Sequence, residues 1–467
     1  MAAPIEPDVK DAPGAAVDVV DLEDNELDVD HEYLALPANK KFWRSSLFQM
    51  VLFGALSFCG PAMSDAIGGL GGGGLETPYT ANTANAISYG MSCFMTLFGG
   101  PLVNKLGIKW ACVIAASAFF LDGSSYYVNS KYGIQWYLIV DAVLCRGEYC
   151  HAAVPQGHER GKFLGIWVSM RNSGEVVGGI VSLCTNIGTT TAGAVSVLTY
   201  IPFMCFQVLG LPVALSLTPT RDVRRKDGTG IPSSADQSWK KEFQALWKHL
   251  KNRRVQLMFI PAFYSFFYGG VFNTYLSLHF STESRALSSF ITPVGTIILV
   301  NIYGRIIDNK SLSQKTRAKL GLAIKFSSGA WLSTGIDFKL NTDLWAKTYL
   351  PYWIMQMVGY TCQLYMYWIL ACFSTDVKAS ARTGGLFRCF ETLGQAISYG
   401  INTHNGNKAI QLYINIGIFI VMLVPMTILI RMVPNVASDI DDVVDLEDHK
   451  GEARVVEAQT ALAHEHP

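Results

Sequence analysis

Two pairs of charged residues stand inside long apolar segments of this chain. Arg171 and Glu175 are four residues apart, and Arg388 and Glu391 are three apart, so in a helix each pair lies on one face. An ionisable group in an apolar environment is costly unless it has a partner or faces water. Such pairs could bind a solute carboxylate or carry protons, or they could be ion pairs that make charge tolerable in a helix bundle. Their repetition in both parts of the chain favours the functional interpretation.

Two uncharged polar residues, Asn273 and Gln363, are further candidates, because an amide inside an apolar segment also needs a partner. They stand in segments crowded with aromatic residues, 263–275 and 352–368, some of which could contact an apolar or aromatic solute. Asp141, in another apolar stretch, could pair with Arg171. We therefore expect a polar pathway built from these side chains.

Other residue types argue against catalysis and metal binding. Cys145, Cys150, His151 and His158 carry ligand atoms, but their spacing fits no zinc pattern. The chain has no Ser/His/Asp or Cys/His constellation that would indicate an enzyme. We expect no catalytic residue, no metal and no cofactor.

The composition indicates that these residues are positioned by membrane helices. Half of the 467 residues are hydrophobic and only 16% are charged, against about 25% in soluble domains. The mean hydropathy is +0.25. These values exclude a disordered chain, a disulfide scaffold and a soluble nucleic-acid-binding protein, and they favour a polytopic membrane protein.

Apolar runs long enough to cross a bilayer recur along the chain, since about 20 helical residues span the hydrocarbon core. We predict an all-α polytopic membrane protein with two groups of six spans, at 47–67, 83–103, 108–128, 133–154, 163–184, 194–217, 255–277, 286–304, 318–336, 347–373, 383–402 and 409–432.

The fourth span is the weak point of this pattern. Its clean apolar run, 134–145, has only 12 residues, about 18 Å of helix against a core of about 30 Å. Charged residues follow it, beginning with Arg146 and Glu148. Either a short, polar span crosses while packed inside the bundle, or the sequence carries a gene-model error, which is the interpretation we favour.

The formal net charge is zero, but the charges are segregated. Residues 1–32 hold eleven carboxylates and residues 437–467 hold nine, whereas the 404 residues between them carry 34 basic and 17 acidic side chains. With the N-terminus inside, the inner segments collect 26 basic residues and the outer loops five. This positive-inside bias predicts that both termini are cytosolic. We expect the acidic tails to be solvated and to lie against the basic inner loops.

The predicted organisation is therefore an acidic tail at 1–40, a six-span half at 41–217, a basic linker at 218–254, a six-span half at 255–432 and an acidic tail at 433–467. Within the linker, 239–253 has the pattern of a basic amphipathic helix suited to an anionic membrane surface. In span 163–184, Gly174, Gly178 and Gly179 predict close packing against a neighbouring helix.

A short motif occurs twice, six spans apart. It reads Gly-x-x-x-(Asn/Asp) followed by basic residues, which suits a close helix approach and then a short polar turn. Its residues are Gly100, Asn104, Lys105, Gly107 and Lys109 after span 2, and Gly304 and Asp308 after span 8. Two copies at equivalent places indicate a duplicated transporter architecture.

This repeat resembles the loop motif of the major facilitator superfamily, from which it departs in having Asn104 where an aspartate is usual. Further segments resemble the fungal uncoordinated-ninety-three-like branch, namely 70–74, 158–162, 223–229, 285–287, 315–318 and 365–368. The resemblance implies a bundle of two six-helix halves that moves a small solute by alternating access, with Glu175 or Glu391 as possible proton carriers. It also implies an alternative, a non-transporting protein that regulates or escorts a channel or receptor. The expected partners are the lipid bilayer, an unidentified small molecule and, in the alternative, another membrane protein, but no nucleic acid.

Overall fold

The computed structural model describes residues 30–144, 160–224, 228, 239–307, 335–371, 377–404, 406 and 408–433. The part of each predicted span that falls within these residues is largely helical. Span 318–336 lies almost wholly outside them, as do the tail residues 1–29 and 434–467 and the sequence segments 158–159 and 315–318.

The first half contains six helices that correspond to spans 1 to 6. They are α3 (Ser46–Cys59), α4 (Pro61–Gly69), α5 (Pro78–Tyr132), α6 (Gln135–Leu144), α7 (Arg160–Asn186) and α8 (Tyr200–Leu215). The long α5 covers spans 2 and 3, because its regular geometry is interrupted only at Gly107, with φ 77° and ψ 155°. A left-handed φ of this kind is readily adopted only by glycine.

The second half begins with the predicted amphipathic helix, which is α9 (Trp239–Leu250). It continues with α10 (Arg253–Ser265), α11 (Tyr268–His279), α12 (Thr282–Ile307), α14 (Thr342–Ala371), α15 (Val377–Ile401) and α16 (Lys408–Met432). Two short helices, α1 (His31–Ala35) and α2 (Ala38–Arg44), precede the bundle. The end of the predicted tail 1–40 is thus helical where it is described, and most of its described side chains are exposed.

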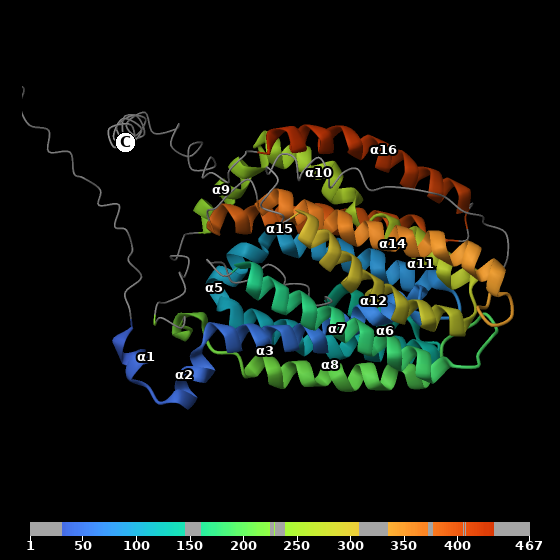
Figure 1. Ribbon diagram of the computed structural model, residues 1–467, viewed down its shortest axis with the longest axis horizontal. Helices are drawn as coiled ribbons and strands as arrows, with labels where there is room; N and C mark the ends of the chain where they lie inside the picture. Colours follow the sequence, from blue (N-terminus) through green and yellow to red (C-terminus); the bar gives the residue numbers. More distant parts are fainter. Residues whose placement is uncertain are drawn as a thin grey trace, which may run out of the picture.

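The helices of the bundle run along its long axis, with α1, α2 and α9 at one end (Figure 1). We call this the proximal end and the opposite one the distal end. The two halves meet chiefly where α5 packs on α15 and α7 on α12. Within the described residues, the β structure consists of two isolated bridges, Ser45 with Arg224 and Phe280 with Ile336.

The first span of each half is broken. Span 1 is divided at Gly60, where φ is −101° and ψ is −86°, and Pro61 then starts α4. Span 7 is divided between α10 and α11, at Phe266 and Phe267. Proline at a first helical position fits, because its missing N–H would have no intrahelical partner there. Breaks in spans six apart agree with the predicted duplication.

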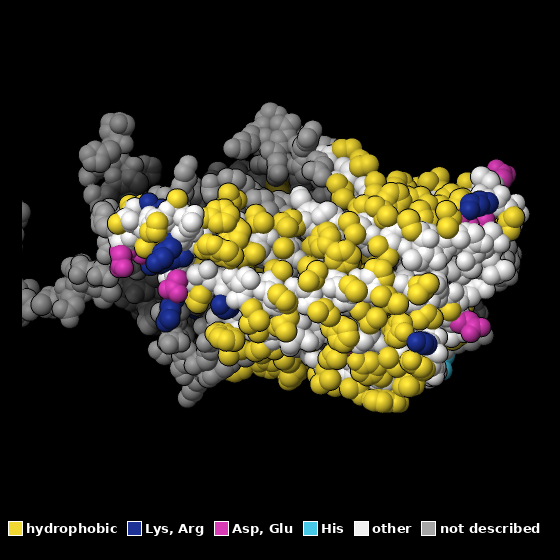
Figure 2. Space-filling model, turned by 90° about the horizontal axis from the view of Figure 1, so that it is seen from below, with side chains coloured by type: hydrophobic (Ala, Val, Ile, Leu, Met, Phe, Trp, Pro, Cys, Tyr) yellow, Lys and Arg dark blue, Asp and Glu magenta, His cyan; other side chains and the backbone are white. Residues whose placement is uncertain are grey.

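Apolar side chains cover the middle of the bundle surface, and charged ones gather at both ends (Figure 2). Five described segments are long and apolar enough to cross a membrane, namely Ser46–Gly69, Leu106–Tyr132, Val197–Leu215, Arg253–His279 and Ile410–Met432. Large apolar residues exposed to the surroundings include Trp110, Ile114, Val208, Ile298 and Val424. In water such a belt would be unfavourable, whereas in lipid it matches the solvent.

The structure describes only the first part of span 4. Its helix α6 has ten residues, about 15 Å of rise against a hydrocarbon core of about 30 Å. The residues that would complete the crossing, 145–159, lie outside the described part, and so do Cys145, Cys150, His151 and His158.

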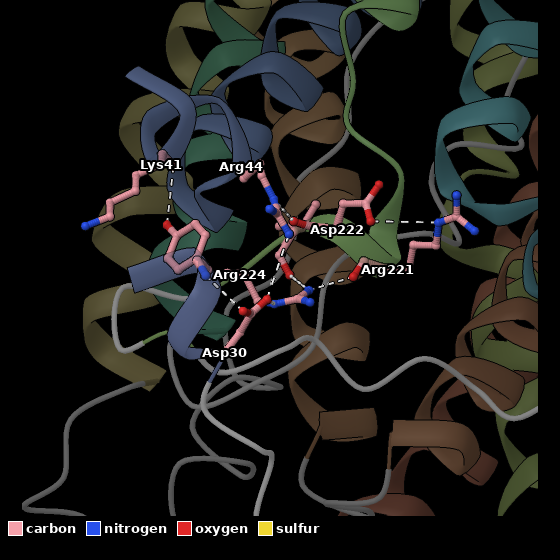
Figure 3. A network of polar contacts seen from close by, with 8 residues as sticks. Asp30, Lys41, Arg44, Arg221, Asp222 and Arg224 are labelled. Atoms are coloured by element: carbon pink, nitrogen blue, oxygen red, sulfur yellow. Dashed lines mark hydrogen bonds and ion pairs between the residues drawn. The ribbon is translucent and has the colours of Figure 1, made fainter. Parts of the chain in front are cut away.

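A polar network at the proximal end ties the start of the described chain to the basic linker (Figure 3). Asp30 accepts a hydrogen bond from Arg224 Nε at 2.9 Å, and Arg44 Nη2 lies 4.0 Å from the same carboxylate. Arg44 Nε also donates to the carbonyl of Asp222 at 2.8 Å. The acidic tail thus contacts the basic linker at Asp30, as predicted.

Candidate functional site

Arg171 stands beside two carboxylates in the first half. It is the twelfth residue of α7, close to the middle of that helix. Its Nη2 atom lies 2.5 Å from Oδ2 of Asp65 on α4, and its Nε atom lies 3.7 Å from Oε1 of Glu175. The Glu175 side chain is only 8% exposed. This cluster, Asp65–Arg171–Glu175, holds one cation and two acids.

Glycine packing brings Asp65 to Arg171. A Cβ atom on Gly174 would lie 2.7 Å from Cβ of Ala62, and one on Gly178 would lie 2.4 Å from Cβ of Ala66. Only glycine therefore allows α7 to approach α4 this closely. The predicted close packing of these glycines is confirmed, and the neighbouring helix is α4.

The second half has a matching cluster around Glu391. Arg388, the twelfth residue of α15, forms an ion pair with Glu391, which is fully buried. The same carboxylate accepts hydrogen bonds from Gln363 Nε2 on α14 and from Ser265 Oγ at the end of α10, both at 2.8 Å. Gln363, selected from the sequence, thus belongs to this site.

The two clusters repeat one design. In each half, a charged pair near the middle of the fifth span meets a polar group from the broken first span, Asp65 in one case and Ser265 in the other. Neither Asp65 nor Ser265 was selected from the sequence. Asp65 could have been found by the rule that selected Arg171, because it is a charge within an apolar span.

Side chains of α14 lie where the clusters face each other. Tyr360 is within electrostatic range of Asp65, Arg171 and Glu175 of the first half. Tyr367 is within range of Arg388 and Glu391, and also of Arg171. Tyr360 also packs edge-on against Phe266, with ring centroids 5.4 Å apart. Tyr360 and Tyr367 of α14 therefore lie near charged groups of the two clusters.

Asn273 belongs to a different polar group. Its Nδ2 atom donates to the Tyr399 hydroxyl at 2.9 Å, and its Oδ1 atom accepts from Gln356 Nε2 at 3.4 Å. The Tyr399 ring stacks on Tyr89 of the first half, with centroids 5.5 Å apart. The polar partner expected for Asn273 is present, although the contacts place it beside Tyr399 and Gln356 rather than against either charged cluster.

Two further carboxylates are held within the first half. Asp141 accepts a hydrogen bond from Ser125 at 3.1 Å, so Asp65, and not the expected Asp141, supplies the ion pair found for Arg171. Asp122, which the sequence reasoning missed, accepts from Ser64 on α4 at 2.5 Å.

The repeated loop motif is described only in part. The backbone at Gly100, Asn104 and Lys105 is helical, the chain breaks at Gly107, and Lys109 is half-buried in α5. Gly304 lies in the last turn of α12, and Asp308 lies outside the described residues. In the first copy the helical geometry is interrupted at Gly107 alone, so the predicted polar turn stays a prediction.

Comparison with known proteins gives consistent matches. The chain matches the Major Facilitator Superfamily model over residues 149–399. It is 30% identical to notoamide biosynthesis cluster protein O′ of Aspergillus versicolor over 424 residues, which cover 85% of this chain and 91% of that protein. It is 26% identical to UNC93-like protein 1 of Arabidopsis thaliana over 411 residues, 81% of this chain and 88% of the relative.

Solved transporters share the fold. A crystal structure of the peptide transporter POT aligns with a TM-score of 0.53 at 14% identity, covering 84% of this chain and 95% of the other. The partially occluded inward open xylose transporter XylE from E. coli aligns with a TM-score of 0.52 at 14% identity, covering 83% and 98%. At this identity the likeness establishes the architecture and leaves the solute open.

Proposed function

Because this chain belongs to the Major Facilitator Superfamily, in its UNC93-like branch, we propose that it moves a small solute across a membrane by alternating access. The family and fold make it an integral, multi-pass membrane protein with a transporter architecture, not an enzyme. Its solute passes between the two halves, as expected when binding residues lie at a repeat interface near the midplane.

The observation that carries this proposal is the pair of facing clusters. Arg171 and Arg388 are both the twelfth residue of a fifth-span helix, and each lies within electrostatic range of the other. Two guanidinium groups beside Tyr360 and Tyr367 suit a solute that joins a carboxylate to an aromatic or apolar body. Each cation already has an acidic partner, so an incoming carboxylate would exchange with Asp65, Glu175 or Glu391.

Proton coupling is assigned to the first-half cluster. With both acids ionised, Asp65–Arg171–Glu175 carries a net charge of −1, and one proton makes it neutral. The pair of Arg388 and Glu391 is already balanced, and Gln363 and Ser265 hold Glu391 as a carboxylate. When the pathway closes around the cluster and excludes water, a neutral cluster costs less free energy than a charged one. Glu175 is thus the proton carrier of the proposed cycle.

The test uses vesicles that contain the purified full-length protein and an enclosed pH-sensitive dye. Phenylacetate, indole-3-acetate and N-acetylphenylalanine serve as probe solutes. We expect at least one of them to drive proton entry, Glu175→Gln to abolish the pH dependence of that flux, and Asp343→Asn to leave it unchanged. Asp343 is the control because its ion pair with Lys347 is highly exposed and lies within one helix. Flux that keeps its pH dependence in Glu175→Gln overturns the assignment to the first-half cluster, and flux that keeps it when Glu391→Gln is added overturns proton coupling through either glutamate.

One observation favours a second function. The clean apolar run of span 4 in the sequence, 134–145, has only 12 residues, too few to cross a bilayer as one helix, and a fourth span usually borders the pathway in this architecture. A non-transporting protein that escorts a channel or receptor would tolerate this defect. That function predicts a stable membrane partner in a crosslinked pull-down, together with no flux of any probe. Flux without such a partner excludes it.

The orientation is also a proposal. The basic residues predict that α1, α2 and the linker with α9 face the cytosol, so the distal end faces the other side. A protease added to sealed, right-side-out vesicles should then leave epitopes at both termini intact. Cleavage of either epitope in sealed vesicles would reverse the assignment.

A further inference from the structure

We propose, on the basis of the proposed alternating-access function, that Arg285 is the latch of the distal gate. Its guanidinium donates hydrogen bonds to the backbone of the glycine-rich loop between spans 1 and 2. These bonds must break before the pathway opens at the distal end. The residue acts by positioning the two halves, not by touching the solute.

Arg285 joins the second half to two loops of the first. It stands at the start of α12 and is fully buried. Its Nε, Nη2 and Nη1 atoms donate to the carbonyl oxygens of Leu70, Gly71 and Gly193, each at 2.7 Å. A fourth bond runs from Nη2 to the carbonyl of Leu75 at 3.3 Å.

The glycine-rich loop has the conformation that these hydrogen bonds require. Gly71, Gly72, Gly73 and Gly74 all have positive φ, between 53° and 79°, which other residues rarely adopt. Such a turn directs neighbouring carbonyls toward one point. A Cβ on Gly71 would lie 3.0 Å from the carbonyl oxygen of Asn273, so the loop also packs directly on α11. Two sequence segments of no evident role, 70–74 and 285–287, therefore meet.

Other bonds between the halves surround the latch. The backbone N–H groups of Thr282 and Glu283 each donate at 3.0 Å to the loop after α7, at Thr191 and Thr189 respectively. Asn82 Nδ2 of α5 donates to Thr274 Oγ1 at 2.9 Å and to the Asn402 carbonyl at 2.7 Å. Together they close the distal end between the halves.

The hydrogen bonds of Arg285 suit a contact that forms and breaks repeatedly. Among the described residues, no carboxylate lies within ion-pair distance of Arg285, so its partners are neutral carbonyls. When the loop withdraws, water replaces these carbonyls on the guanidinium, so the net free-energy change of each exchange is much smaller than the gross strength of the bond. A buried ion pair would hold the gate more permanently, because separating it leaves two buried charges. Arg285 thus closes the gate reversibly.

The experiment measures amide hydrogen exchange in the full-length protein in lipid nanodiscs, without any solute. The variants are Arg285→Met, Arg285→Lys and Asn82→Ala, with Lys347→Met as the control at the same end. We expect Arg285→Met to raise exchange at least tenfold in residues 70–75 and 279–285. Exchange should fall in residues 92–98 of α5 and 383–390 of α15, which lie toward the proximal end of the bundle. The reason is that rocking of the two halves opens the pathway at one end and closes it at the other. Arg285→Lys should give a smaller change of the same kind.

The opposite signs at the two ends separate a latch from a merely structural residue. Faster exchange at the distal end alone, or at both ends, would mean local or global unfolding and would overturn the proposal. Unchanged exchange would overturn it too. If Arg285→Met fails to fold, Asn82→Ala must give the opposed changes by itself, since it breaks neighbouring bonds of the same gate. Because no solute is used, a failed flux assay leaves this result interpretable.

Discussion

The Nη2 atom of Arg171 lies 2.5 Å from Oδ2 of Asp65, a residue 106 positions earlier in the chain. This contact joins the broken first span to the fifth, and Glu175 shares the same guanidinium. Glu175 is nearly shielded at 8% exposure, whereas the side chains of Arg171 and Asp65 are 23% and 35% exposed.

Removing the cation alone should destabilise the protein. Arg171→Met leaves Asp65 and Glu175 facing each other without a positive charge, a change that costs about 3 kcal/mol or more for buried pairs. The triple variant with Asp65→Asn and Glu175→Gln should recover most of the lost melting temperature, because no uncompensated charge remains. Intrinsic tryptophan fluorescence during heating measures both effects. A triple variant no more stable than Arg171→Met would mean that the ion pairs do not set the stability.

Gly178 should tolerate no side chain. A Cβ there would lie 2.4 Å from Cβ of Ala66, so Gly178→Val must push α4 away from α7 and carry Asp65 off Arg171. We expect a loss of about 1–3 kcal/mol, as for other overpacked cores. Gly90 on α5 is the matched control, since nothing lies within 4 Å of a Cβ built on it. Thermal unfolding of Gly178→Val and Gly90→Val compares the two positions, and equal melting temperatures would refute the packing argument.

Oxidation should link the two halves. The Sγ atoms of Cys93 on α5 and Cys389 on α15 lie 3.4 Å apart, near enough to form a disulfide after a small movement. With a protease site inserted at 229–238, the halves of oxidised and cleaved protein should migrate together on a gel until a reductant is added. Cys93→Ser should abolish the link. Separation of the oxidised wild-type halves would show that these helices are not neighbours.

The proximal network should weaken in acid. The backbone N–H of Tyr33 and the Arg224 guanidinium hold the pKa of Asp30 below its ordinary value. A carboxyl group with a lowered pKa stabilises the folded state at pH values above its ordinary pKa, and that contribution disappears as the pH falls through the lowered value. The fluorine NMR signal of 5-fluorotryptophan at Trp43 should therefore change in that acidic window. Asp30→Asn should give the low-pH signal at neutral pH, and an unaltered neutral signal would contradict the assignment.

The sequence was sufficient for features that depend on local pattern. Apolar runs located the helices, because membrane helices must satisfy their own backbone and be apolar outside. The same logic selected Arg171, Glu175, Arg388 and Glu391, which the structure arranges as two ion pairs. Gly174 and Gly178 predicted a close approach, since small residues at that spacing have few other uses in a helix.

Partners distant in the chain could not be predicted. Nothing near Asp65 indicates that it meets Arg171, and Asp141 was an equally reasonable partner until the packing of α4 on α7 was known. Arg285 counted only as a basic residue in an outer loop, because its four carbonyl partners come from segments 92 to 215 residues away. Asn273 and Gln363 had the same sequence signature, yet their contacts lie in different polar groups.

The break at Gly60 makes α4 a short helix that is separate from α3. Its nine residues carry Asp65 near the middle, and the chain that follows at once presents the carbonyls of Leu70 and Gly71 to the latch. A displacement of the loop would therefore act on the ion pair across about one and a half turns of helix. Thermodynamic linkage then makes the effect mutual. If gate opening weakens the ion pair between Arg171 and Asp65, breaking that pair must favour the open gate by the same free energy.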